Sequence, residues 1–427
     1  MLIPLQRLLG PQRFKMISMT TAAAKRPQLA HLTAQLDDLR QRGTFFKLRE
    51  LDDQQAPVCT YDGKRVINLA SNNYLGLCNH PKLEEAAIAA TKKYGVGSGA
   101  VRTIAGTMHI HMELEEKIAA FKGVEACVVF QSGFTANAGT VSSILGKDDF
   151  ILSDELNHAS IIDGARLSKA KIKVFRHKDV AHAEELLQEV QNQPGHKLLI
   201  TDGVFSMDGD IGPVDKLAAL AEKYNAIMMV DDAHASGVLG RNGRGSVDHF
   251  HVTDKVDIQV GTLSKAIGAL GGYVCGSRDL IDYLYHRARP FLFSTSHPPS
   301  VAATCIAAFD ILENEPDRIQ RLWDNTIYFK QQLTDAGFDV GGNSTPKSET
   351  PITPIIIGGS QDARRTMDFS RALFDAGVMA TGIAFPTVPE GKARIRTIMT
   401  SEHTRAEIDK ALEVFTTVAK KMGILEA

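Results

Sequence analysis

Short apolar runs alternate with amphipathic stretches along the chain from about residue 68 to residue 289. The runs have the length of strands, whereas the stretches between them, such as residues 112–121 and 216–224, carry apolar residues at helical spacing. Strands and helices that alternate in this way predict a mainly parallel, doubly wound α/β sheet. The predicted strands are residues 126–130, 150–153, 171–175, 197–201, 226–230 and 257–261.

The pattern changes after Pro290. A long helical pattern covers residues 299–336 and leads into a stretch rich in Gly, Ser, Thr and Pro at 341–351. A strand at 352–357, a helix at 362–376, a strand at 393–400 and a helix at 404–422 follow. We therefore predict an N-terminal segment (37–67), a large domain (68–298), a linking helix (299–340) and a smaller C-terminal α/β domain (341–427).

The first 36 residues contain no Asp or Glu, but they include five basic residues, Arg7, Arg13, Lys15, Lys25 and Arg26. This composition permits a mitochondrial transit peptide. A leader without fixed structure, or translation from Met16 or Met19, explains it as well. We expect a disordered basic leader at 1–36 and a cytoplasmic protein, with the mitochondrion as the alternative.

Composition excludes several classes of partner. The 48 Lys and Arg nearly balance the 50 Asp and Glu, so we expect small-molecule partners, and neither nucleic acid nor a membrane surface. No apolar run approaches the ~18 residues that a bilayer-spanning helix needs. The five cysteines are scattered without a C-x-x-C pair, which suits a reducing compartment and predicts no metal site.

Motifs for several other chemistries are missing. The sequence has no P-loop, no H-E-x-x-H and no G-x-S-x-G. The glycines at 95–99 lack the G-x-G-x-x-G spacing and do not directly follow an apolar strand, so a Rossmann dinucleotide site is not expected.

Four polar segments instead follow the predicted strands: Q-S-G-F at 131–134, N-H at 157–158, D-D-A-H at 231–234 and T-L-S-K at 262–265. In an open α/β sheet, ligands bind at this carboxyl edge of the strands. Asp231 there could keep a pyridinium nitrogen protonated, although an Asp that caps the next helix is equally common. Lys265 could lose its proton in a confined site and form an imine, whereas a lone Lys after a strand is usually a solvated charge.

Other residues near this edge could complete a cofactor site. Ser132, Gly133 and Phe134 form a strand-to-helix turn whose backbone N–H groups could bind a phosphate, if it is more than an ordinary capped turn. Thr262 and Ser264 could supply hydroxyls to the same phosphate. His158, His234 and Ser206 could contact a heteroaromatic ring and its phenolic oxygen. Each could equally be an ordinary polar residue with hydrogen-bond partners inside the protein.

Two arginines share one face of the strand at 393–400. Arg394 and Arg396 are two residues apart, so both guanidinium groups should lie on the same side. One could bind a substrate carboxylate, and a surface salt bridge is an equally good explanation. Arg102 and Lys169 are candidates for a coenzyme A site by position only, and a solvated surface is the simpler interpretation.

An ordered set of motifs resembles the α-oxoamine synthases, pyridoxal-phosphate (PLP) enzymes of fold type I. The motifs are NNYLGL (72–77), GSGAVR (97–102), DELNHAS (154–160), DDAH (231–234), GTLSK (261–265) and RIR (394–396). They span nearly the whole chain after residue 37. The resemblance implies a large, mainly parallel, seven-stranded sheet domain, a small C-terminal α/β domain, and PLP as the cofactor.

The resemblance also implies roles for individual residues. Lys265 would carry PLP as a Schiff base and move the substrate proton, Asp231 would face the pyridine nitrogen, and His158 would stack on the ring. Ser206 and His234 would contact the phenolate oxygen, and His234 could also hydrogen-bond the thioester. Asn73 and Arg396 match positions that bind the amino-acid carboxylate. Thr295 matches a residue that reaches a phosphate across a dimer interface, so a homodimer with shared active sites is implied.

Three more stretches indicate which reaction within this family the protein catalyses. TDGVFSMDG (201–209), RPFLFS (289–294) and ARIRT (393–397) resemble glycine C-acetyltransferase, also called 2-amino-3-ketobutyrate CoA ligase, more than its relatives. We therefore expect a PLP-dependent acyltransferase that condenses glycine with acetyl-CoA to 2-amino-3-oxobutyrate, or runs this reaction backwards in threonine catabolism. The alternatives are 8-amino-7-oxononanoate synthase, which joins L-alanine to a pimeloyl thioester in biotin synthesis, and a PLP aminotransferase.

Overall fold

The computed structural model describes residues 27–341, 349–358, 362–385 and 387–426. It divides into two units, residues 1–47 and 48–427. In the first unit, a short 3-10 turn (Pro27–Leu29) leads into α1 (Ala30–Gln41). The prediction of a disordered leader is therefore wrong for residues 30–36, because Ala, Leu and Gln favour a helix. Residues 1–26 of the predicted leader lie outside the described residues.

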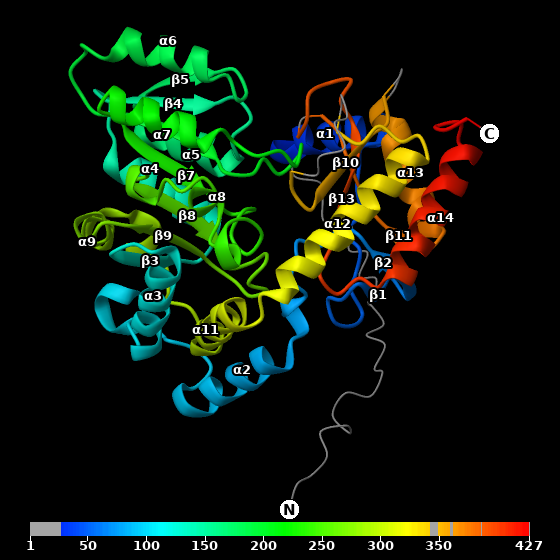
Figure 1. Cartoon of the computed structure of the whole chain (residues 1–427), viewed down its shortest axis with the longest axis horizontal. Helices are drawn as coiled ribbons and strands as arrows, with labels where there is room; N and C mark the ends of the chain where they lie inside the picture. The colour runs from blue at the N-terminus through cyan, green and yellow to red at the C-terminus, as the bar shows by residue number, and fades with distance from the viewer. Residues whose placement is uncertain (1–26, 342–348, 359–361, 386, 427) are drawn as a thin grey trace, which may run out of the picture. The chain divides into compact units, whose positions relative to one another are not determined.

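The second unit contains a seven-stranded sheet in the order β3-β9-β8-β7-β6-β4-β5 (Figure 1). Only β9 runs antiparallel to its neighbours. The prediction of an α/β fold with a large, mainly parallel sheet and a smaller C-terminal domain is confirmed. The strands are β3 (Ala126–Phe130), β4 (Phe150–Asp154), β5 (Lys171–Phe175), β6 (Lys197–Asp202), β7 (Ile227–Asp231), β8 (Ile258–Thr262) and β9 (Gly272–Gly276).

The six predicted strands are all present, but β9 was missed. Gly272 and Gly276 begin and end β9, and glycine is depleted in strands, so the sequence pattern hides it. Close approach explains the first glycine: a Cβ on Gly272 would lie 2.4 Å from the carbonyl carbon of Ser132. The missed strand thus packs against the turn at the end of β3.

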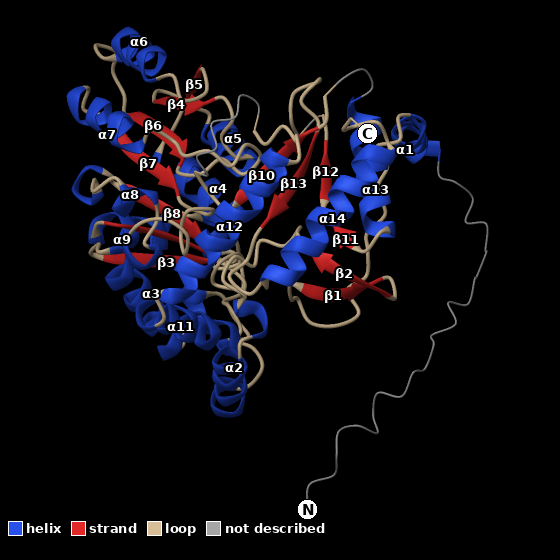
Figure 2. Ribbon diagram, turned by 45° about the vertical axis from the view of Figure 1, so that its right-hand side comes forward, coloured by secondary structure: helices blue, strands red, loops and turns tan. Residues whose placement is uncertain are grey.

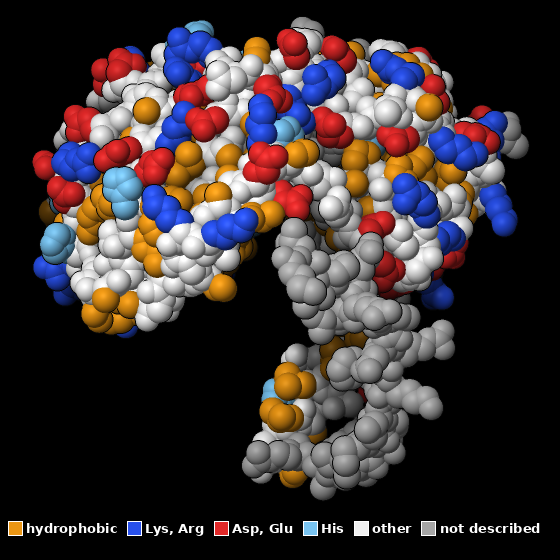
Figure 3. Space-filling model, turned by 90° about the horizontal axis from the view of Figure 1, so that it is seen from below, with side chains coloured by type: hydrophobic (Ala, Val, Ile, Leu, Met, Phe, Trp, Pro, Cys, Tyr) orange, Lys and Arg blue, Asp and Glu red, His pale blue; other side chains and the backbone are white. Residues whose placement is uncertain are grey.

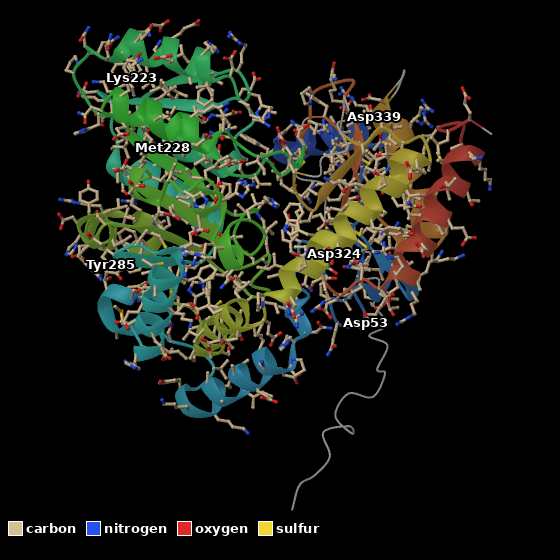
Figure 4. The ribbon with its side chains drawn as sticks, viewed as in Figure 1. Asp53, Lys223, Met228, Tyr285, Asp324 and Asp339 are labelled. Carbon is tan, nitrogen blue, oxygen red and sulfur yellow. The ribbon has the colours of Figure 1, made fainter. Side chains whose placement is uncertain are left out.

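Helices cover both faces of this sheet (Figure 2). On β3, Val128 packs with α4, α5 and α9, whereas Val129 faces the core shared with α2, α3 and α11. Because both faces of the central strands are buried, a strand such as β7 is a run of apolar residues, whereas β5 at the edge of the sheet alternates Lys with apolar residues and is largely exposed. Met228, labelled in Figure 4, lies in the apolar run of β7.

The helices of this region are α2 (Pro81–Tyr94), α3 (His109–Lys122), α4 (Gly133–Ile144), α5 (Ala159–Ser168), α6 (Val180–Val190), α7 (Val214–Lys223), α8 (Ser246–His249), α9 (Arg278–Arg287) and α10 (Arg289–Leu292). Short helical turns lie at Leu77–Asn79, Arg102–Gly106, Arg241–Gly243 and Thr253–Lys255.

The predicted linking helix is two helices, α11 (Pro299–Asn314) and α12 (Asp317–Asp335). Pro316 separates them because it has no N–H group and forces the residue before it out of the helical conformation. Glu315 accordingly adopts φ −124° and ψ 61°. The single helix predicted for residues 299–336 is therefore wrong.

Two smaller sheets are formed by strands that follow α12 and by two strands from the start of the second unit. The first, with the order β10-β13-β12, consists of β10 (Ile352–Ile356), β13 (Arg394–Ile398) and β12 (Thr381–Ile383). The second joins β1 (Val58–Tyr61) and β2 (Lys64–Asn68) to β11 (Val378–Met379). α13 (Asp362–Asp375) and α14 (Arg405–Lys421) complete this region. The predicted N-terminal segment thus pairs with strands of the C-terminal region, which its local sequence did not indicate. Residues 342–348 of the Gly/Ser/Thr/Pro-rich stretch lie outside the described residues.

The surface shows no strong bias of charge. On the face in Figure 3, basic and acidic side chains are interspersed. Within the described ranges, no helix is long and apolar enough to cross a membrane, and no group of three His, Cys, Asp or Glu side chains could hold a metal ion.

Candidate active site

The polar segments that follow the parallel strands meet around a cavity of about 220 Å³. The predicted site residues that line it are Ser132, Gly133, Phe134, His158, Ser206, Asp231, His234, Thr262, Ser264 and Lys265. Five further residues line it that were not predicted: Asn137, Ser160, Asp202, Val204 and Ala233. The cavity lies at the carboxyl edge of the sheet because the strands end there in polar residues.

A chain of hydrogen bonds holds Asp231 and His158 in place. Asn137 Nδ2 donates to Asp231 Oδ2 at 2.5 Å and to Ser160 Oγ at 2.9 Å. Ser160 Oγ lies 2.8 Å from His158 Nδ1, and the backbone N–H of Ala233 donates to Asp231 Oδ1 at 2.9 Å. Asp231 does not cap a helix, because turns follow it. These hydrogen bonds therefore fix the Asp231 carboxylate and the His158 imidazole at the same cavity.

Lys265 follows β8 after the turn at 262–264 and lines the cavity. Its Nζ forms no hydrogen bond or ion pair with the described residues. Burial lowers the pKa of this amine to about 8, and Asp231 opposes that shift. Since a much larger fraction of the amine is then neutral near pH 8 than for an exposed lysine, Lys265 can act as a nucleophile and a base.

The turn at 132–134 can bind an anion. Ser132 is the N-cap of α4, and its Oγ accepts a hydrogen bond from Thr135 N at 3.1 Å. Backbone N–H groups of the first turn of a helix have no partner inside the helix and favour negative charge. Thr262 Oγ1 and Ser264 Oγ, 2.7 Å apart, line the same cavity. These donors fit a phosphate.

The two histidines at the cavity are kept neutral. Burial, then the positive charges of Lys265 and Arg396, hold the pKa of His234 well below its usual value. Burial also lowers the pKa of His158. His234 Nδ1 lies 2.7 Å from Tyr74 Oη, a contact that the sequence did not predict.

Asp202 is a second buried acid at the cavity. It ends β6 and pairs in register with Asp231 at the end of β7. Burial, then the charge of Asp231, raises the pKa of Asp202 well above its usual value. Its Oδ2 accepts from His158 N at 3.2 Å, whereas its Oδ1 is buried and unpaired among the described residues. The signal in the sequence was the same as for Asp231, an acid directly after an apolar strand.

The two arginines of β13 differ in their partners. Arg394 Nη1 forms an ion pair with Asp208 at 2.6 Å, so its charge is already paired. Arg396 has no carboxylate partner in the described parts of the chain, and it donates to Ser206 O at 2.6 Å and to Asn72 Oδ1 at 3.3 Å. Of the two guanidinium groups, only that of Arg396 therefore lacks a carboxylate partner among the described residues.

Three predicted site residues do not line the cavity: Arg396, Asn73 and Thr295. Asn73 is buried, and its side chain accepts from Cys78 N at 3.3 Å; the neighbouring Asn72, not Asn73, contacts Arg396. Thr295 is exposed, and its carbonyl accepts from Gln131 Nε2 at 2.8 Å.

Arg102 is not a surface residue that could bind coenzyme A. Its two Nη atoms bind both carboxylate oxygens of Glu115 at 2.8 and 2.9 Å, and the ion pair is buried. Lys169 is exposed with φ 64° at the end of α5. The candidate based on Arg102 is therefore wrong, because its position in the sequence carried no information on burial.

The residues present fit PLP. The cavity combines a phosphate cradle at the N-terminus of α4, a carboxylate fixed by two donors and a lysine amine whose pKa is lowered. The unpaired Oδ1 atoms of Asn137 and Asp202 add polar groups without a partner inside the described protein.

Three comparisons place these features among known proteins. The family model described as aminotransferase class I and II matches residues 64–415. The 8-amino-7-oxononanoate synthase of Symbiobacterium thermophilum is 57% identical over 394 residues, which are 92% of this chain and 98% of that protein. The enzyme of the same name from Bacillus pumilus is 55% identical over 399 residues, 93% of this chain and 100% of that protein.

Among solved structures, the serine palmitoyltransferase of Sphingomonas wittichii is similar with a TM-score of 0.87 and 30% identity, covering 93% of this chain and 99% of that one. Structures of serine palmitoyltransferase with PLP have the same TM-score. PLP is the cofactor of this chain, as predicted.

The prediction of glycine C-acetyltransferase is wrong, because the curated relatives at 51–57% identity are 8-amino-7-oxononanoate synthases. Of the three stretches that suggested it, only residues 201–209 line the cavity, through Asp202, Val204 and Ser206. The chain belongs to the aminotransferase class I and II family and, within it, to the α-oxoamine synthases, PLP-dependent acyltransferases of fold type I.

Proposed function

We propose that this protein is an 8-amino-7-oxononanoate synthase, which joins L-alanine to a pimeloyl thioester. The observation that carries the proposal is the identity of 51–57% to enzymes of that name over more than 90% of the chain. Three carbons of alanine and seven of the pimeloyl group give a nine-carbon product, so one carbon leaves as CO₂. The thiol of the thioester leaves as the acyl group is transferred.

The cavity supplies a partner for each part of PLP. Backbone N–H groups at the start of α4 and the hydroxyls of Thr262 and Ser264 would hold the phosphate. Asp231 would bind the pyridine nitrogen, since Asn137 and Ala233 hold its carboxylate at the cavity. Ring contacts would come from His158, and contacts to the phenolate oxygen from Ser206 and His234.

Lys265 is the proton carrier in this proposal. PLP, when bound, withdraws electrons from the α-carbon of an amino acid, and a protonated ring nitrogen strengthens that effect. The Lys265 amine, with its pKa lowered to about 8 by burial, would take the proton from the alanine Cα. His234, which is neutral, would contact the acyl oxygen without adding a charge that repels Lys265.

Arg396 would bind the alanine carboxylate. It is a half-buried cation without a carboxylate partner among the described residues, whereas the neighbouring Arg394 is paired with Asp208. Burial lowers the pKa of Arg396, so a ligand carboxylate would stabilise its charge. We infer that Arg396 and the substrate carboxylate form that pair.

We also propose a homodimer with shared active sites. An isolated bridge joins Val101 to Thr295, which brings the turn at 102–106 beside residues 293–295. Ile104 is 83% exposed and Phe293 is 70% exposed. Apolar side chains gathered at an exposed Thr295, which does not line the cavity of its own chain, suit a surface that meets a second subunit.

The test supplies purified PLP-loaded enzyme with L-alanine and either pimeloyl-CoA or a pimeloyl carrier-protein thioester, while free thiol and a nine-carbon product are measured. We expect thiol release that needs both substrates. Glycine with acetyl-CoA is run in parallel, and a faster reaction with that pair would contradict the proposal. Amino transfer to a 2-oxo acid without any thioester would instead identify an aminotransferase.

A further inference from the structure

Tyr74 is an unassigned residue that contacts a candidate catalytic histidine. Its Oη lies 2.7 Å from His234 Nδ1, and the two rings meet edge to face with centroids 6.2 Å apart. Tyr74 is 1% exposed and His234 is 7% exposed, so water does not compete for this hydrogen bond. Tyr74 comes from the loop before α2, and His234 follows β7, so the contact joins distant parts of the sequence.

The direction of this hydrogen bond follows from the protonation of both partners. Burial raises the pKa of Tyr74 far above neutrality, so its hydroxyl keeps the proton. Burial and two nearby cations keep His234 neutral, so it carries one ring proton. The hydroxyl of Tyr74 has no other partner among the described residues. Tyr74 therefore donates to Nδ1, and the ring proton of His234 is on Nε2.

We propose that Tyr74 is a positioning residue that fixes His234 as the Nε2–H tautomer, so that the imidazole presents a hydrogen-bond donor to the cavity. His234 lines the cavity, and its Nε2 has no partner among the described residues. The ligand groups in reach of such a donor are oxygens: the phenolate oxygen of PLP and the acyl oxygen of the thioester. The identity of these two oxygens rests on the proposed function, whereas the tautomer of His234 does not depend on it.

A donor at this position suits acyl transfer. Negative charge develops on the acyl oxygen as the carbanion attacks, and a fixed N–H donor stabilises that charge. The opposite tautomer would turn a lone pair toward the same oxygen and repel it. A hydrogen bond to the other ring nitrogen commonly sets which nitrogen carries the proton.

The test reads the tautomer directly. ¹⁵N-labelled histidine is incorporated into the PLP-loaded enzyme, and long-range ¹H–¹⁵N spectra distinguish protonated from unprotonated ring nitrogens. His234→Asn identifies the His234 signals by their loss. We expect a protonated Nε2 and an unprotonated Nδ1 in the wild type, and a loss of that preference in Tyr74→Phe.

Tyr273→Phe is the matched control. Tyr273 is also a fully buried tyrosine whose hydroxyl has one side-chain partner, Ser236 Oγ at 2.8 Å, and it does not line the cavity. Its variant should leave the His234 signals unchanged. A wild-type enzyme with the proton on Nδ1, or a Tyr74→Phe variant with unchanged signals, would overturn the proposal.

Kinetics separate this role from direct substrate binding. In Tyr74→Phe we expect kcat for acyl transfer to fall by about 10–100-fold with little change in KM for the amino acid. A rise in KM for alanine with an unchanged tautomer would mean that Tyr74 binds the substrate instead. If the spectra show the expected tautomer but the enzyme rejects alanine and pimeloyl thioesters, the proposed function fails and the role of Tyr74 stands.

Discussion

Two buried polar clusters of this protein differ in how completely they are paired. In the first, around Glu115, Arg102 binds both carboxylate oxygens, Tyr285 Oη donates to Oε2 at 2.9 Å, and Val129 N donates to Oε1 at 2.9 Å. Tyr285, labelled in Figure 4, comes from α9, so the cluster connects α9 with α3 and β3. Every atom of the Glu115 carboxylate thus has partners inside the protein.

The second cluster, at the cavity, is incomplete. Asn137 bonds Asp231 and Ser160, but its Oδ1 is buried without a partner, as is Oδ1 of Asp202. The amine of Lys265 has a lowered pKa and no hydrogen-bond or ion-pair partner among the described residues. An unpaired buried polar group costs about 1–3 kcal/mol, so a ligand that supplies the missing partners gains affinity. The Glu115 carboxylate is thus fully paired within the protein, whereas polar atoms of the cavity cluster are left for a ligand to pair.

The largest effect should come from the unpaired lysine. We expect Lys265→Ala to lower acyl transfer by at least ~10³-fold, because it removes the proposed proton carrier and the attachment point for PLP. Borohydride trapping followed by peptide mass spectrometry should locate the cofactor on Lys265. Lys330 is the control, since burial also lowers its pKa to about 8. Trapping on Lys330→Ala should remain complete, and an adduct that persists in Lys265→Ala would refute the assignment.

The two acids at the cavity should respond differently to the same change. Asp231→Asn removes a charge beside the pyridine nitrogen, whose pKa should fall by about 1–3 units, so activity should fall by ~10–10³-fold. Burial and the charge of Asp231 raise the pKa of Asp202 well above its usual value, which favours the protonated acid that an amide resembles. Asp202→Asn should therefore cost much less. Steady-state rates and the visible cofactor spectrum measure both, and equal losses would be inconsistent with this difference.

The complete cluster should affect stability and not the cofactor. Glu115→Gln leaves the Arg102 charge buried without a carboxylate, so the free energy of unfolding should fall by ~3–5 kcal/mol. Urea unfolding measures this loss. The cofactor spectrum of the molecules that remain folded should not change, and an altered spectrum would show that the two clusters are coupled.

The smallest effect concerns pH. A lowered amine pKa means that the neutral form of Lys265 becomes dominant above about pH 8, and not only above the ordinary lysine pKa of 10.5. The rate of PLP attachment to the cofactor-free protein should rise about tenfold per pH unit below pH 8 and level off above it. Stopped-flow absorbance follows this rate. A rise that continues to pH 10 would mean that Lys265 is not perturbed in the cofactor-free protein.

Much of the fold could be predicted from the sequence because local patterns determine it. The six parallel strands were short segments rich in apolar residues, and polar residues such as Asp231 and Thr262 marked the carboxyl ends of two of them. The strand and the pairing that the sequence did not predict depend on tertiary contacts, which override the local preference of the residues. Gly272 hid β9, and β2 pairs with β11, which lies about 310 residues later in the chain.

The site was predicted in part for the same reason. Side chains in the segments that directly follow strands, such as Lys265 and His234, could be expected at one edge of the sheet. Asn137 and Ser160 lie inside helices that also carry ordinary polar residues, so nothing in their local sequence marks them.

By itself, the sequence determined the α/β class, the cofactor edge of the sheet and the family, because strand periodicity and ordered motifs are local properties of the chain. Only the tertiary structure decided which polar groups are paired. Arg102 and Arg394 are paired with carboxylates, whereas Arg396 and Lys265 have no carboxylate partner among the described residues. The physical reason is that pairing and burial depend on residues brought together from distant segments, and those contacts set the charge and the pKa of each group.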